Sequence, residues 1–242
     1  MKDKIAIVTG GTGALGRKVV EKLADEGIKV YVPAHNLEEF NSIFDNSFDK
    51  KRENYILRKI FAFNCNATDE TSVTEFVRNV SAQEKGNIDF LINTVGGISG
   101  KEDIIDLTAK SLDKMIDLNF KSAFYFSREV LKNMKNKSYG RIISIGAMAG
   151  LEVTPGRFAY SFSKAGVINL MDTISEEMKE FNIRCNTIIP GIIDTPSNRE
   201  WGSDEDIKKW VTADEIAKII YNLISDEFSN VRSSQIKVYG SI

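Results

Sequence analysis

The chain has 242 residues, a length that suits one well-cored α/β domain. Its net charge of −2 argues against a partner that is a nucleic acid or an acidic membrane. Its two cysteines make no disulfide framework and its one histidine, His35, cannot build a zinc site, so we expect a reducing compartment and no metal.

Strand-like apolar runs alternate with helix-like stretches along the chain. The runs lie at 5–10, 29–34, 58–65, 89–95, 140–146, 183–191 and 233–240, with helical patterns between them, notably at 16–27, 108–136 and 157–181. Strands that are apolar on both faces and separated by helices predict a Rossmann-type, doubly wound α/β fold. We expect a mostly parallel, seven-stranded sheet with helices on both faces. Without any linker or internal repeat, residues 1–242 are predicted to form a single domain.

The region after the second strand carries a helix start. Asn36, with Glu39 three residues later, is typical of a capping box. The polar stretch 41–55 is predicted to be a surface extension of that helix. The chain opens directly on the strand-like KIAIVTG with no signal peptide before it, and no apolar run approaches the length of a membrane span. These features predict a cytoplasmic protein without a membrane partner.

A glycine-rich turn, TGGTGALG, lies between the first strand and the first helix. Glycine lets the backbone turn tightly and approach a pyrophosphate, whose charge then lies at the helix N-terminus. The candidate cofactor-binding residues of this turn are Gly10, Thr12, Gly13, Ala14, Leu15 and Gly16. A phosphate-binding loop of the NTPase type needs Lys and then Ser or Thr after its last glycine. Arg17 and Lys18 follow here, which excludes that alternative.

Five more motifs follow in order: NATD (66–69), NTVG (93–96), Asn119 in DLNFKSAF, Tyr160 with Lys164 in YSFSK, and PGIIDT (190–195). With the glycine turn, they resemble the short-chain dehydrogenase/reductase superfamily over essentially the whole chain. The resemblance implies an NAD(P)-dependent oxidoreductase that acts on a small molecule, and a homodimer or homotetramer formed through helices 108–136 and 157–181. The further cofactor contacts that it implies are Asn66, Ala67, Asn93, Gly96, Tyr160, Lys164, Pro190, Gly191, Ile193 and Thr195.

Tyr160 and Lys164 are four residues apart and so share a helix face. An ammonium near a phenol lowers the pKa of the phenol, so Tyr160 is expected to transfer a proton near neutral pH. By the family resemblance, Lys164 also holds the nicotinamide ribose, and Asn119 anchors a water that relays protons. The catalytic residues are therefore predicted to be Asn119, Tyr160 and Lys164, while the cofactor supplies the hydride.

One departure from the family pattern is large. The family's catalytic Ser lies thirteen residues before the Tyr, and here that position is Ala147. Ser144, Ser161 and Ser163 are near in sequence, but none is a convincing replacement, since the last two lie off the Tyr–Lys face. GGTGALG, VTPGRFAYSFSKAGV and IIDTPSNREW resemble segments of dihydropteridine reductases, which keep the Tyr and Lys but lack the Ser.

The main expectation is therefore hydride transfer to a quinonoid dihydropterin-like or other conjugated acceptor, which does not need the oxyanion donor. One alternative is a 3-oxoacyl or other carbonyl reductase, or an alcohol dehydrogenase, of the same fold. An alternative of another class is a non-catalytic dinucleotide-binding protein. A serine hydrolase is excluded, because Met148 occupies the nucleophile position of GAMAG.

The end of the second strand bears on the cofactor. Its residues Ala34, His35 and Asn36 include no carboxylate to select the ribose 2′-hydroxyl of NAD, and His35 is at most a weak clamp for a 2′-phosphate. The sequence thus slightly favours NADP over NAD. Farther on, the polar segment 196–212 holds Trp201 and Trp210. It is predicted to be either a substrate-covering segment that orders on binding or a plain surface helix with both Trp side chains packed down.

Overall fold

The computed structural model describes residues 1–45 and 59–241. The second helix, α2 (Leu37–Asp45), begins where predicted, and Asn36 Oδ1 accepts hydrogen bonds from the backbone N–H groups of Glu38 and Glu39, at 2.8 and 3.2 Å. Most of the extension predicted at 41–55 lies outside the described residues.

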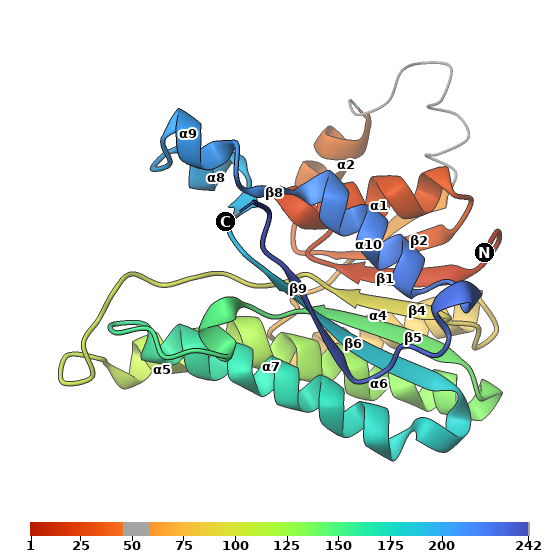
Figure 1. The fold of residues 1–242 in the computed structure, drawn as a ribbon. Coiled ribbons are helices and arrows are strands. Elements are labelled where there is room, and N and C mark those ends of the chain that lie inside the picture. The colour runs from red at the N-terminus through yellow and green to blue at the C-terminus, as the bar shows by residue number, and fades with distance from the viewer. Residues whose placement is uncertain (46–58, 242) are drawn as a thin grey trace.

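A seven-stranded sheet forms the centre of the fold (Figure 1). Its strands are β1 (Ile5–Thr9), β2 (Lys29–Ala34), β3 (Ile60–Asn64), β4 (Phe90–Asn93), β5 (Gly140–Ile145), β6 (Ile183–Pro190) and β9 (Ser234–Val238). They lie in the order β3-β2-β1-β4-β5-β6-β9, and every neighbouring pair is parallel. This confirms the predicted fold class. The chain moves outward from β1 in one direction and from β4 in the other, so a crevice for a ligand is expected at the carboxyl ends of these two strands.

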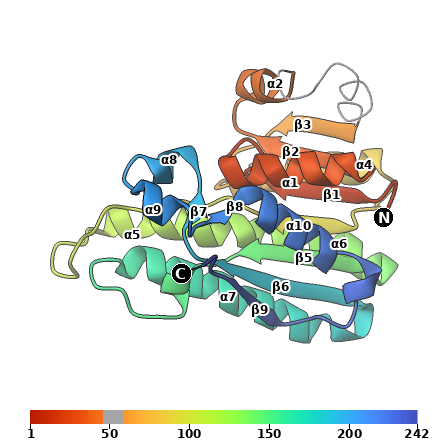
Figure 2. The ribbon, with the colours of Figure 1, turned by 45° about the horizontal axis from the view of Figure 1, so that its top comes forward.

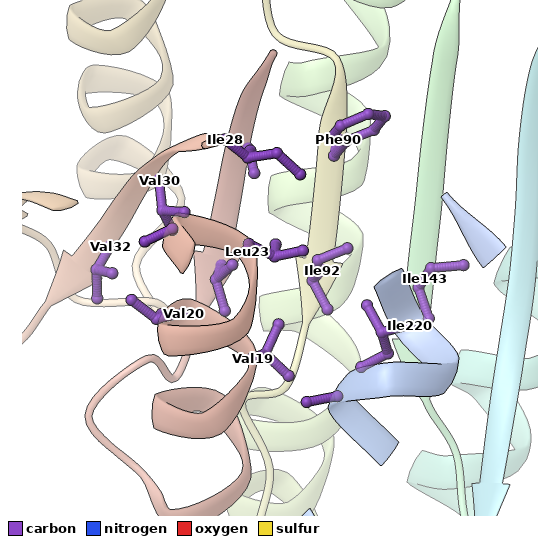
Figure 3. Close-up of a cluster of buried hydrophobic side chains, with 14 of the residues drawn as sticks. Val19, Val20, Leu23, Ile28, Val30, Val32, Phe90, Ile92, Ile143 and Ile220 are labelled. Carbon is purple, nitrogen blue, oxygen red and sulfur yellow. The ribbon is translucent and has the colours of Figure 1, made fainter. Parts of the chain in front are cut away.

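Helices cover both faces of the sheet (Figure 2). One face carries α1 (Ala14–Asp25) and α10 (Ala213–Leu223), and the other carries α4 (Glu70–Gln83), α6 (Ser122–Lys137) and α7 (Phe158–Glu177). Alternate strand residues serve the two cores, because side chains alternate across a strand: Ala6 and Val8 belong to the first, Ile5 and Ile7 to the second. Figure 3 shows the first core, where side chains of α1 and Ile220 of α10 gather over β2, β4 and β5. Within the described residues, no helix combines the length and apolar character that crossing a membrane requires.

The long helix predicted at 108–136 is interrupted. It consists of α5 (Ala109–Met115), a π-helical turn (Ile116–Lys121) and α6. A π turn widens the helix by one residue and is often found at functional sites. Asn119 lies within it. Helix α7 likewise ends earlier than predicted, at Glu177, and a 3₁₀ turn (Lys179–Phe181) follows. Two further 3₁₀ turns span Met148–Gly150 and Asp226–Phe228.

The segment predicted at 196–212 is not one plain surface helix, and its role as a substrate-covering segment stays a prediction. Two short helices, α8 (Pro196–Arg199) and α9 (Asp204–Ile207), lie between strands β7 (Ile193–Asp194) and β8 (Val211–Thr212), which pair in parallel. Figures 1 and 2 place both helices beyond the end of the sheet toward which the strands point. The Trp201 and Trp210 rings are 5.1 Å apart, yet Trp210 is 6% exposed and Trp201 is 63% exposed. Only one of the two Trp side chains is therefore packed down.

Candidate active site

The glycine turn is built by close contact between its own backbone atoms. Gly10 has a φ of +65°, which L side chains rarely adopt. A Cβ on Gly16 would lie 2.1 Å from the carbonyl oxygen of Gly10, so no larger residue fits there without a backbone shift. Gly13 precedes α1, and no side chain caps the N-terminus of this helix among the described residues. The free N–H groups and the bare turn suit a dinucleotide phosphate. The other predicted residues of the turn are Thr12, Ala14 and Leu15, which are half-buried, exposed and half-buried.

The carboxyl ends of β2 and β3 lie beside this turn. His35 is exposed after β2, and its carbonyl oxygen accepts from Asn64 Nδ2 at 3.5 Å. After β3, Asn66 Oδ1 accepts from the backbone N–H and the hydroxyl of Thr68, at 3.1 and 2.9 Å. Ala67 is half-buried against the core on the α4 face. The predicted adenine-side residues thus follow strands at the same edge of the sheet as the glycine turn, with β2 between β3 and β1, although the Asn66 side-chain carbonyl is engaged within its own turn.

Lys164 is buried at 5% exposure beneath this edge of the sheet. Its Nζ donates a hydrogen bond of 2.9 Å to the carbonyl oxygen of Ile145, at the end of β5. Burial disfavours the ammonium and lowers the pKa of Lys164 to about 8. The group is thus a cation at neutral pH that loses its proton in mild alkali.

Asn119 is held by the loop that follows β4. Its Oδ1 accepts from the Gly97 N–H at 2.9 Å, and its Nδ2 donates to the Gly97 carbonyl at 3.0 Å and to Ser163 Oγ at 3.1 Å. A Cβ on Gly96 would lie 2.8 Å from Asn119 Oδ1 and 3.0 Å from Lys164 Nζ. The two polar atoms therefore face one small space that only a glycine at position 96 leaves open.

The Tyr160 phenol has no hydrogen-bond partner among the described residues. Burial raises the pKa of Tyr160, and the charge that opposes this shift is that of Arg157. The expectation that Lys164 lowers the phenol's pKa is wrong for this structure. The two residues share a helix, but the Lys164 ammonium is directed to Ile145. A protonated, unengaged phenol is a ready proton donor to a ligand.

No serine replaces the missing hydroxyl at Ala147, which is 8% exposed. Ser144 Oγ is buried in the core, where it accepts from Asn93 Nδ2 at 3.1 Å. Ser161 Oγ is enclosed without a partner on the side of α7 that carries Phe158 and Phe162. Ser163 Oγ donates to the Tyr160 carbonyl at 2.7 Å and accepts from Asn119. Ser163 thus links the Asn119 side chain to the backbone of Tyr160, a role that we did not predict from the sequence.

The remaining predicted residues divide into two groups. The Asn93 side chain does not join the site, since its Nδ2 donates to Ser127 and Ser144 inside the core. Residues of the last motif do lie at the same end of the sheet: Pro190 is the last residue of β6, and Gly191, Ile193 and Thr195 follow it. The Thr195 hydroxyl accepts from the Asn198 N–H at 3.2 Å and so caps α8.

Comparison with known proteins agrees with this geometry. The family model described as short chain dehydrogenase matches residues 4–206. The chain belongs to the short-chain dehydrogenase family. As a member of it, the protein is an NAD(P)-dependent oxidoreductase with a Rossmann-type fold, and the alternative of a non-catalytic binding protein is set aside.

Full-length relatives of this short-chain dehydrogenase include a 3-oxoacyl-(acyl-carrier-protein) reductase FabG from Buchnera aphidicola subsp. Schizaphis graminum. The two are 29% identical over 100% of this chain and 98% of the relative. A 7alpha-hydroxysteroid dehydrogenase from Bacteroides fragilis is 31% identical over 81% of this chain and 74% of the relative. The crystal structure of gox2181 matches with a TM-score of 0.89 and 26% identity over 99% of this chain and 95% of that one. Neither named relative is a dihydropteridine reductase, so they do not support that narrower resemblance.

Proposed function

We propose that this short-chain dehydrogenase is a carbonyl reductase that uses NADH or NADPH, and an alcohol dehydrogenase in the reverse direction. The observation that carries the proposal is the unpartnered Tyr160 phenol, one helical turn from the buried Lys164 cation. Both named relatives are named for reactions at an oxo or a hydroxyl group, which supports the carbonyl alternative over the conjugated acceptor.

The chain's own residues have separate tasks in this reaction. When bound, NAD(P)H supplies the hydride for the carbonyl carbon. Tyr160 Oη donates the proton to the carbonyl oxygen, and its raised pKa keeps the phenol protonated at neutral pH. Lys164 keeps its ammonium on the Ile145 carbonyl, facing the space that Gly96 leaves open, where it would hold the nicotinamide ribose of the cofactor. Asn119 fixes the Gly97 backbone, and with it the wall of the site above Lys164.

Ala147 favours a second candidate, a conjugated acceptor such as a quinonoid dihydropterin. The three neighbouring serines all have their hydroxyls directed elsewhere, so no side-chain hydroxyl near position 147 polarises a simple ketone. A conjugated acceptor takes hydride without that donor.

A spectrophotometric screen separates the two candidates. NADH and NADPH oxidation is followed with 3-oxoacyl esters and simple ketones, with quinones, and with a quinonoid dihydropterin. For a carbonyl reductase, the oxo compounds are turned over, and Ala147→Ser raises their kcat about tenfold or more through the added donor. Turnover of the conjugated acceptors alone, with no gain for ketones in the variant, contradicts the first candidate and supports the second.

We also propose a modest preference for NADPH. The residues that end β2 and follow it, Ala34, His35 and Asn36, carry no carboxylate, and the next acids in the chain, Glu38 and Glu39, are exposed in the first turn of α2. These three residues do not repel a 2′-phosphate. Fluorescence titration of the two reduced cofactors tests this, and a clearly tighter Kd for NADH contradicts it.

Finally, we propose a homodimer or homotetramer located in the cytoplasm. The two cysteines, Cys65 and Cys185, are both buried and unpaired, which suits a reducing compartment. The N-terminal part of α7 carries an exposed apolar face with Phe158 and Phe162 stacked at 5.9 Å, beside a surface cavity of about 410 Å³. A face of this kind on a long helix suits a second copy of the chain, because both copies bury the same side chains.

A further inference from the structure

Arg157 is a cation near Tyr160 that the sequence motifs did not single out. It is the N-cap residue of α7 and lies three residues before Tyr160 in the chain. The side chain is half-buried. Its guanidinium donates one hydrogen bond, to the carbonyl oxygen of Ser99. No carboxylate of the described residues lies within ion-pair distance of it.

Ser99 ties the guanidinium to the loop whose Gly97 is held by Asn119. Ser99 belongs to the loop after β4, three residues beyond Gly96. A Cβ on Gly96 would contact Asn119 Oδ1 and Lys164 Nζ. The same loop is joined to the N-terminus of α7 a second time, because the Glu102 N–H donates to the Gly156 carbonyl at 3.0 Å. Arg157 therefore lies where two loops meet around Tyr160, with most of its five N–H donors unused.

The acids nearest to these loops leave the charge of Arg157 uncompensated. Glu102 Oε1 accepts from the Ser111 hydroxyl at 3.3 Å, and Asp103 lies against Gly156 without an ion pair to the arginine. The charge of Arg157 also reaches the phenol, since it lowers the pKa of Tyr160 against the effect of burial. A half-buried, unpaired guanidinium with a fixed anchor is a site for an anion, and its planar fork matches a carboxylate.

We propose that Arg157 binds a carboxylate of the substrate, and that the substrate is an oxo acid whose carbonyl is reduced at Tyr160. This inference rests on the proposed carbonyl reductase function. It also accounts for Ala147. A substrate fixed by a two-point contact with a guanidinium presents its carbonyl to Tyr160 in one orientation, so a serine hydroxyl is less needed to position it.

The test compares matched substrates that differ only in charge. Short 2-oxo and 3-oxo acids and their methyl esters are reduced by the wild type and by Arg157→Gln, Arg157→Lys and Arg78→Gln. Arg78 is an exposed arginine of α4, and its replacement removes the same charge elsewhere. We expect Arg157→Gln to lower kcat/KM for the acid about 10- to 100-fold, mainly through KM, and to change it less than about threefold for the ester. Arg157→Lys restores part of the loss, and Arg78→Gln changes neither.

Two results overturn the proposal. If Arg157→Gln lowers kcat/KM equally for acid and ester, Arg157 only holds the loop through Ser99. If kcat/KM for the acid does not fall, Arg157 does not bind the carboxylate. If the wild type reduces no acid and no ester, the proposed reaction fails, and calorimetric titration of the oxo acid into the enzyme–NADPH complex then decides the role of Arg157 alone. Tighter binding by the wild type than by Arg157→Gln supports the carboxylate site, and equal binding contradicts it.

Discussion

Two side chains from different elements, Asn119 of the π turn and Lys164 of α7, face one small space in this site. Lys164 donates a hydrogen bond to the end of β5, and Asn119 is hydrogen-bonded to the loop after β4. Gly96 has no side chain and so leaves space between them. Tyr160 then stands with a free phenol. The side chain that holds the loop, Asn119, is therefore a different one from the proposed proton donor, Tyr160.

The first prediction concerns Tyr160. Tyr160→Phe removes only the hydroxyl, so we expect kcat to fall about 10²- to 10⁴-fold, the usual contribution of a positioned general acid. The Kd of NADPH, measured by fluorescence, should stay within about threefold. Tyr125→Phe, on α6, is the matched control and should keep full activity. If kcat of Tyr160→Phe equals that of the wild type, Tyr160 is not the proton donor.

The second prediction concerns the buried charge of Lys164. In the unfolded chain this lysine keeps its proton to about pH 10.5, whereas in the folded chain its pKa is about 8. Between these values the unfolded state binds more protons, so the free energy of unfolding rises with pH. Relative to Lys164→Met, the wild type should gain roughly 3 kcal/mol between pH 7.5 and pH 10.5. Urea unfolding of both proteins measures this, and a difference that does not vary with pH contradicts it.

Some residues of the site could be predicted from the sequence, and others could not. Tyr160, Lys164 and Asn119 stand in recognisable motifs. The spacing of Tyr160 and Lys164 predicts a shared helix face, but it does not say that the ammonium reaches Ile145 instead of the phenol. The contact of Ser163 with Asn119 depends on the π turn, which a pattern of 3.6 residues per turn does not reveal.

At the scale of elements, the turn from β1 into α1 depends on backbone contact. The third prediction is that Gly16→Ala lowers the free energy of unfolding by about 1–3 kcal/mol, because the new Cβ would lie 2.1 Å from the Gly10 carbonyl oxygen. Alanine in a helix otherwise stabilises it by up to about 1 kcal/mol relative to glycine, so the loss would be steric. Gly13→Ala is the control, since its Cβ would lie 3.3 Å from the same oxygen. Thermal unfolding compares the variants, and equal stability would contradict the argument.

Elements with a strong apolar pattern were predictable, and those set by a few polar contacts were not. The strands of the main sheet lie within a few residues of their predicted ranges, and several of them, such as β1 and β4, are apolar and buried on both faces. The small β7–β8 pair and helices α8 and α9 were missed. Each is four residues or shorter and depends on local bonds, such as the Thr195 and Ser203 caps, that carry no periodic signal.

At the scale of the molecule, the alternation of strands and helices predicted the layers and the parallel sheet that the structure has. What covers the outer surface of α7 is a separate question, since none of the helices in the described residues covers Phe158 and Phe162, which are 47% and 53% exposed. Large exposed apolar patches are typical of interaction surfaces.

The fourth prediction follows from this surface. Phe162→Glu introduces a charge at its centre, and burying an unpaired carboxylate between two copies costs several kcal/mol. Sedimentation velocity should show two or four chains for the wild type and half that mass, or a single chain, for the variant. Phe228→Glu, which changes an aromatic residue that is 39% exposed after α10, should leave the wild-type mass unchanged. A wild-type monomer, or a Phe162→Glu variant of unchanged mass and circular dichroism, would contradict the proposed interface, because the apolar face of α7 would then be exposed in solution without a partner copy.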